Sequence, residues 1–105
     1  MRLLQGRRAE VLTETGQTSL TLPSSMTLDL ANETLASLMN GLRPIKGTVV
    51  LDASALQVCD SSAVAVLLAL RRAARELEIG WKIERAPAHL LDLARLYGVE
   101  SLLDA

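Results

Sequence analysis

The residues best suited to chemistry form one short stretch, Asp60, Ser61 and Ser62. They directly precede a long helix predicted from Ala63 to Glu78, and Asp and Ser are among the residue types that most often cap a helix start. A hydroxyl there faces unpaired backbone N–H groups and the positive end of the helix dipole, so a phosphate or a partner's carboxylate would be stabilised beside it. The plain alternative is that these three residues only cap the helix.

The other candidate groups are single residues. Cys59 is the only cysteine and His89 the only histidine, so a disulfide, a thiolate metal cluster and a histidine-based triad all lack partners. We predict that Cys59 is a small buried residue and that His89 is a surface or cap residue.

Enzyme signatures are also missing from the sequence. It contains no Gly-x-Ser-x-Gly elbow, phosphate-binding loop or dinucleotide fingerprint. A serine hydrolase built on Ser61 would need a general base beside it, because a serine hydroxyl alone is a poor nucleophile. We therefore expect no enzymatic activity, no catalytic residues, no metal and no cofactor.

The elements around the turn follow from hydrophobic spacing. Thr48 to Leu51 is a short apolar run that predicts a central strand leading toward the turn. The helix after the turn is apolar on every side from Ala63 to Leu70, so we expect it to be covered all round. Trp81 to Glu84 alternates as a strand after Gly80, and we predict that Trp81 is buried under a helix.

Further helices and strands complete the predicted fold. Asp29 to Leu42 carries apolar residues on one helical face and is expected to end at Gly41 and the stretch from Pro44 to Gly47. Thr27 or Asp29 could cap its start. The alternation in Ala9 to Glu14 and Thr18 to Leu22 predicts a hairpin.

The order strand, strand, helix, strand, helix, strand, helix makes the later strands parallel, with right-handed crossovers. We predict an α/β fold with a small mixed sheet of four to five strands, backed by three to four helices. With 105 residues, the chain is expected to form one domain over residues 1–105.

The third helix carries more apolar surface than one side of contact needs. It is predicted to open at Pro87 and end at Gly98. We expect the core face to contain Leu90, Leu91, Ala94 and Tyr97. Leu93 and Leu96 lie off that face and are therefore candidates for a partner-binding surface.

The stretch from Val50 to Leu68, with Asp60-Ser61-Ser62 at its centre, resembles the signature of the STAS domain family, which includes the anti-sigma factor antagonists. The stretch from Ala88 to Val99 is similar to the MlaB-type members, the STAS subunits of Mla phospholipid ABC transporters. The resemblance covers roughly residues 9 to 103. It implies the STAS (SpoIIAA-like) fold.

This resemblance implies a non-catalytic accessory subunit that docks on an MlaF-like ATPase subunit and regulates its assembly or activity. The implied contacts are the turn Asp60, Ser61 and Ser62. The alternative is an anti-sigma factor antagonist, in which an anti-sigma factor kinase phosphorylates Ser61 or Ser62. The added charge of about −1.5 to −2 would then disrupt the interface.

The sequence departs from the STAS signature at Ala63, where the family usually has Gly. An Ala at a positive φ would be strained and would reshape the turn, which weakens the phosphorylation hypothesis more than the docking one.

Charge and hydropathy limit the partners. The chain has 11 basic and 12 acidic residues and a net charge of −1, so it has no global field to attract nucleic acid or anionic lipid. Its longest apolar run, Ala63 to Leu70, is too short to span a bilayer, and no secretory signal is apparent. We expect a cytoplasmic protein without membrane insertion, associated with the inner membrane only through a transporter complex.

Several arginines could form a basic patch on the second half of the long helix and beyond it. Acidic residues are interleaved with them, so a solvated, salt-bridged face is predicted. The residues concerned are Arg71, Arg72, Arg75, Arg85 and Arg95, with Glu76, Glu78 and Glu84.

Overall fold

A three-stranded parallel sheet forms the centre of the computed structural model, which describes residues 16–101. The strand order is β1-β3-β5, with Thr18 opposite Val49 and Val49 opposite Trp81. The bounds of these strands are β1 (Gln17–Thr21), β3 (Thr48–Asp52) and β5 (Gly80–Glu84). The prediction that the later strands are parallel is confirmed, and β1 joins them in the same direction.

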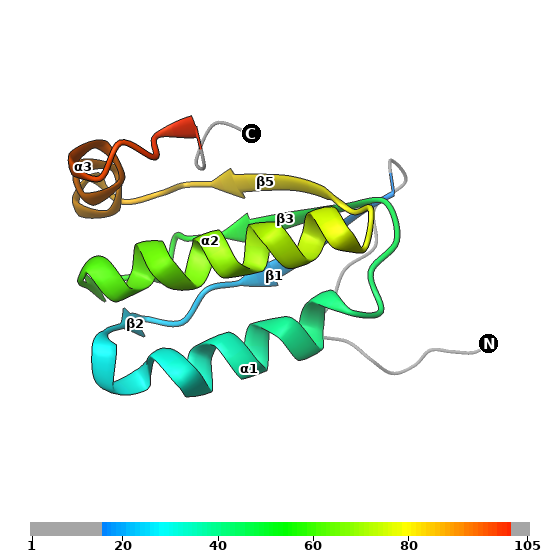
Figure 1. The fold of residues 1–105 in the computed structure, drawn as a ribbon, viewed down its shortest axis with the longest axis horizontal. Coiled ribbons are helices and arrows are strands. Elements are labelled where there is room, and N and C mark those ends of the chain that lie inside the picture. Colours follow the sequence, from blue (N-terminus) through cyan, green and yellow to red (C-terminus); the bar gives the residue numbers. More distant parts are fainter. Residues whose placement is uncertain (1–15, 102–105) are drawn as a thin grey trace.

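Three helices connect and cover the strands, as Figure 1 shows. Helices α1 and α2 lie side by side on one face of the sheet, and α3 packs against α2 near the carboxyl ends of the strands. Their bounds are α1 (Ala31–Leu42), α2 (Ser61–Glu76) and α3 (Ala88–Leu96). The predicted α/β architecture with parallel crossovers is therefore confirmed.

The predicted hairpin lies only partly within the described residues. Its second strand, Thr18 to Leu22, corresponds to β1, whereas its first, Ala9 to Glu14, lies outside them. All strand pairs among residues 16–101 are parallel. The antiparallel pairing that would make the sheet mixed stays a prediction.

Two short strands lie where the sequence indicated only connections. β2 (Ser25–Met26) pairs in parallel with β4 (Val58–Cys59), and together they form a separate two-stranded sheet. Two-residue strands are too short to show alternation, which explains why hydrophobic spacing missed them. Their position matters, because β4 ends directly before Asp60.

The core lies between the sheet and the two covering helices. Its aliphatic side chains include Val49, Leu51, Leu67 and Leu70, all nearly inaccessible to solvent. Trp81 and Cys59 are also buried, which confirms both predictions. Since Trp81 is the only described aromatic residue in this core, Leu, Val and Ala fill most of it.

Helix α1 differs in detail from its prediction. A 3-10 turn, η1 (Leu28–Leu30), precedes it, so the regular helix begins at Ala31. Gly41 lies inside the helix and does not end it. An added Cβ at Gly41 would lie 3.1 Å from the Leu20 side chain, so the glycine lets α1 pack closely on β1.

Helix α3 also presents a different face to the core. Leu90 and Ala94 are fully buried as predicted, but Tyr97 is 54% exposed. Leu93, expected to be exposed, is partly buried and packs against the core. Tyr97 is the C-cap residue, with φ −93° and ψ 5°, and the chain leaves the helical conformation there.

Candidate docking site at the start of helix α2

The small β2–β4 sheet holds the turn that opens α2. The backbone N–H groups of Gln57 and Val58 both donate to the Ser24 carbonyl, at 2.8 and 3.0 Å. The Asp60 N–H donates to the Met26 carbonyl at 3.3 Å. These bonds fix Asp60 beside the chain that enters η1, although the two segments are more than 30 residues apart in sequence.

The Asp60 carboxylate caps two helical turns at once. Its Oδ1 accepts from the Ser62 N–H at 2.8 Å, and its Oδ2 accepts from the Leu28 N–H at 3.2 Å. The Ser62 N–H, followed by the Leu28 N–H, holds the pKa of Asp60 below its ordinary value despite partial desolvation. The cap predicted for Asp60 is present and serves η1 as well as α2.

The predicted caps of the first helix are not used in this way. The Thr27 hydroxyl donates to the Asp29 carboxylate at 2.6 Å, and neither side chain accepts a bond from the helix start. Asp60 takes that place from across the fold, which a local sequence pattern could not indicate.

The two serines of the turn differ in solvent exposure and hydrogen bonding. Ser62 is partly buried, and its N–H donates to the Asp60 carboxylate. Ser61 is exposed, and its hydroxyl makes no hydrogen bond to any other residue in the range 16–101. Ser61 is therefore the hydroxyl that is accessible to a partner.

Ala63 fits the turn without strain. It lies inside α2, where no residue has a positive φ, and its N–H donates to the Asp60 carbonyl at 2.9 Å. Its side chain is fully buried. The family's usual Gly is therefore not needed here to relieve backbone strain.

An apolar groove begins at Ser61 and follows one side of α2. Its volume is about 300 Å³, and it lies between α2 and the end of α3. The lining residues are Ser61, Val64, Ala65, Leu68, Tyr97 and Val99. The sequence predicted that the first half of α2 is covered on all sides. This prediction is wrong, because Ala65 is exposed and Leu68 is only partly buried.

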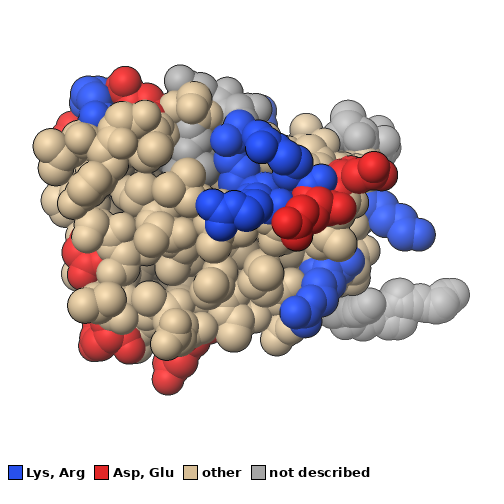
Figure 2. Space-filling view, in the orientation of Figure 1, with Lys and Arg blue, Asp and Glu red and all other residues tan. Residues whose placement is uncertain are grey.

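The surroundings of the groove are largely uncharged. Figure 2 shows a broad face without Lys, Arg, Asp or Glu over the first half of α2. Leu96, predicted as a partner-surface residue, is 74% exposed on α3. Leu28, at the same end of the molecule, is 75% exposed beside the Asp60 turn.

Comparison with known proteins assigns the family. A family model described as "Mlab, STAS domain" matches residues 10–104. This chain belongs to the MlaB-type STAS family. No curated protein matches it in sequence.

The STAS fold is also supported by a solved structure. The anti-sigma factor antagonist SpoIIAA in its unphosphorylated form superposes with a TM-score of 0.68 at 12% sequence identity. The alignment covers 90% of this chain and 83% of SpoIIAA. The α/β STAS fold predicted from the sequence is therefore confirmed.

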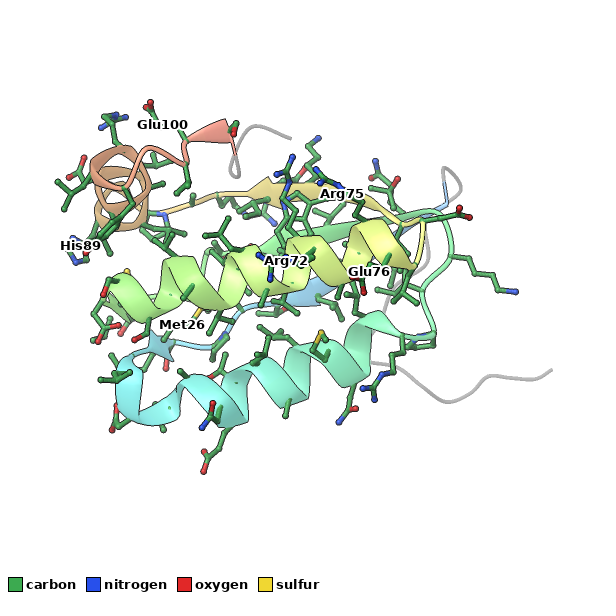
Figure 3. All side chains as sticks on the ribbon, in the orientation of Figure 1. Met26, Arg72, Arg75, Glu76, His89 and Glu100 are labelled. Carbon is green, nitrogen blue, oxygen red and sulfur yellow. The ribbon has the colours of Figure 1, made fainter. Side chains whose placement is uncertain are left out.

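Two interactions tie α3 and β5 to the end of this STAS domain that carries the Asp60 turn. His89 Nε2 lies 3.1 Å from the Cys59 carbonyl, so the exposed histidine at the start of α3 contacts the strand before the turn (Figure 3). Arg85 Nη2 lies 3.0 Å from Asp52 Oδ2, which joins the ends of β3 and β5. Neither contact follows from a local sequence pattern.

The remaining chemistry of the STAS domain is limited. Burial raises the pKa of the Cys59 thiol, which disfavours a reactive thiolate. Residues 16–101 contain no group of three or more His, Cys, Asp or Glu side chains that could hold a metal ion. Within the same range, no helix is long and apolar enough to cross a membrane.

Proposed function

We propose that this STAS domain is a non-catalytic accessory subunit that docks on the ATPase subunit of an Mla-type phospholipid ABC transporter. It would act as a single cytoplasmic domain, held at the inner membrane through that complex, and regulate ATPase assembly or activity. The observation that carries this proposal is the free Ser61 hydroxyl at the end of an uncharged apolar groove.

The groove has the chemistry of a protein contact. Ala65 and Leu68 follow Ser61 at four and seven residues, so all three lie along one side of α2. A partner side chain inserted there would bury apolar surface on both molecules, and Ser61 would supply one directional hydrogen bond. Leu96, next in sequence to the groove residue Tyr97, is exposed on α3, whereas Leu93 packs against the core.

Regulation would follow from binding alone. A subunit that binds one ATPase conformation more tightly than another shifts the equilibrium toward that conformation. It also stabilises the folded partner by mass action. Because no described base hydrogen-bonds to Ser61, the hydroxyl serves as a contact group rather than a nucleophile.

The test is co-purification of the chain with the Mla ATPase subunit of the same organism, followed by size exclusion. We expect stable co-elution for the natural chain. Ser61→Glu should weaken binding at least about tenfold, because a carboxylate in an apolar contact is desolvated without a partner. Ser61→Ala removes only the hydroxyl and should weaken it less.

A matched control places the same charge elsewhere. Ser37 is exposed on α1, away from the groove, so Ser37→Glu should leave co-elution unchanged. The proposal is wrong if the folded natural chain does not bind an active ATPase. It is also wrong if Ser37→Glu and Ser61→Glu weaken binding equally.

The accessible Ser61 hydroxyl also favours a second candidate, an anti-sigma factor antagonist controlled by phosphorylation. Phosphate at Ser61 would carry about −1.5 to −2 charge into the contact and release the partner. Mass spectrometry of the protein from cells would detect a phosphate on Ser61. Its persistent absence, together with tight ATPase binding, would exclude this candidate.

A further inference from the structure

A second surface lies on the other half of α2. Three arginines, Arg71, Arg72 and Arg75, follow one another within little more than one helical turn. Figure 2 shows basic side chains gathered over this part of the helix, and Figure 3 labels Arg72 and Arg75 there. Arg72 and Arg75 are exposed, and Arg71 is partly buried.

The sequence predicted a salt-bridged face, and the described residues only partly agree. Arg85 and Arg95 pair with carboxylates, at 3.0 Å to Asp52 and 2.9 Å to Glu100. None of the three α2 arginines makes an ion pair or hydrogen bond within residues 16–101. Their positive charge is therefore available to a ligand.

This arrangement has an energetic cost without a partner. Arg71 and Arg75 are spaced i, i+4, where like charges destabilise a helix by about 0.2–0.5 kcal/mol. Glu76 follows Arg72 at the same spacing, but the order basic before acidic is the weaker one, and the two do not pair. A bound anion would remove the repulsion between the guanidinium groups.

The shape beside the arginines restricts the anion. A hollow of about 190 Å³ is lined by Arg71, Arg75, Ile79 and Trp81. It has room for one or two carboxylate side chains, and two guanidinium groups at its wall can each bind a carboxylate through paired N–H groups. The largely buried side chains of Ile79 and Trp81 complete its lining.

We infer that Arg71, Arg72 and Arg75 form a second binding surface for an acidic segment of a protein partner. A flat anionic membrane or a nucleic acid fits less well, because Glu76 lies beside the arginines and the chain's net charge is −1. Ser61 and Arg72 are 11 residues apart, about 16 Å along the helix axis. One partner could therefore contact both surfaces.

A labelled hexaglutamate peptide is the probe, and hexaglutamine is its neutral control. Fluorescence anisotropy at low salt should show hexaglutamate binding that weakens as salt is raised. Replacing all three arginines by Gln should weaken it about tenfold, the sum of three exposed ion pairs. Arg95→Gln, which removes an arginine already paired within the domain, should change it little.

Two further variants sharpen the test. Arg71→Lys with Arg75→Lys keeps the charge but loses the paired N–H groups, so it should bind hexaglutamate about threefold more weakly. Ser61→Glu should bind it as tightly as the natural chain, which separates this surface from the Ser61 groove. The inference does not depend on the proposed transporter partner.

Several outcomes would overturn the inference. Equal binding of hexaglutamate and hexaglutamine would show that charge does not decide the contact. Full binding by the triple variant would place the site elsewhere. Arginine-dependent sedimentation with phosphatidylglycerol vesicles, without peptide binding, would assign the patch to a membrane surface instead.

Discussion

The two halves of α2 present surfaces of opposite character, one apolar and one basic. The first half carries only apolar residues and one free hydroxyl along its open side, from Ser61 to Leu68. The second half carries Arg71, Arg72 and Arg75 without ion pairs inside the described fold. If both surfaces bind partners as proposed, the first would select a partner by shape and by the absence of charge, and the second would select one by charge.

The two ends of α2 are also closed by different kinds of contact. Asp60 joins the start of α2 to η1 through two backbone N–H groups. The end of α2 has a Schellman arrangement, with the Ile79 N–H bonded to the Ala74 carbonyl and Glu78 in the left-handed region at φ 61°. The start of α2 is thus tied to a segment more than 30 residues away, whereas the far end is closed by local bonds and contains a residue in the strained left-handed region.

The largest expected effect is a difference in stability between two substitutions in the first half of α2, one on its buried side and one on its exposed side. Leu67 is fully buried, so Leu67→Ala should lower the free energy of unfolding by about 2–5 kcal/mol. Leu68 lines the groove and is only partly buried, so Leu68→Ala should cost less than half as much and mainly weaken partner binding. Urea unfolding measures both. Equal losses would mean that the groove side belongs to the core.

The next effect tests how the docking turn is held. Asp60→Ala removes the acceptor for two helix starts, so the thermal midpoint should fall by roughly 4–8 °C. Asp60→Asn retains one accepting oxygen and should lose about half of that. Asp92→Ala, which removes an exposed ion pair to Arg95, is the control and should shift the midpoint little. A drop no larger than this control would contradict the double cap.

A smaller effect should be seen in acid. The Arg85 side chain, followed by the Ser54 N–H, holds the pKa of Asp52 far below its ordinary value, and the Ser62 N–H lowers that of Asp60. Carboxyls with lowered pKa values in the folded state stabilise it above the pKa of the unfolded chain, and this contribution is lost as the pH falls. The midpoint temperature of thermal unfolding should therefore fall between pH 5 and pH 3. Asp52→Asn should make the decline shallower, and an unchanged slope would show that the Arg85 pair is not formed in solution.

The sequence was sufficient for elements with strong periodicity and insufficient for contacts between distant segments. The run Thr48 to Leu51 and the apolar helix after Ser62 indicated the strand, turn and helix at the centre of the site. No local pattern indicated β2 and β4, which pair over two residues each. The second cap of Asp60 on Leu28 depends on that pairing, so it was equally beyond sequence reasoning.

Solvent exposure was the least predictable property. The apolar residues of α3 were assigned to faces by helical spacing, but Leu93 lies inside the helix three residues after the buried Leu90 and packs against the core. Tyr97, directly after the last helical residue, is exposed. The arginines of α2 were expected to pair with nearby glutamates. Pairing depends on side-chain directions around the helix end, which residue order alone does not specify.

The smallest prediction concerns the strain at the far end of α2. Helices α2 and α3 end in the same hydrogen-bond pattern, with Glu78 at φ 61° in one and Gly98 at φ 70° in the other. Since a side chain is disfavoured in this region, Glu78→Gly should raise the free energy of unfolding by about 0.5–1 kcal/mol.

Gly98→Ala is the matched converse and should lower the free energy of unfolding by a similar amount. No atom lies within 4 Å of a Cβ added at Gly98, so backbone conformation alone sets its cost. Urea unfolding of both variants tests whether these two changes in the free energy of unfolding have opposite signs. If Glu78→Gly also leaves hexaglutamate binding unchanged, the strain at this end is independent of the arginine surface. If hexaglutamate binding weakens, the left-handed turn at Glu78 positions Ile79 and the hollow beside it, so that the turn contributes to the arginine surface.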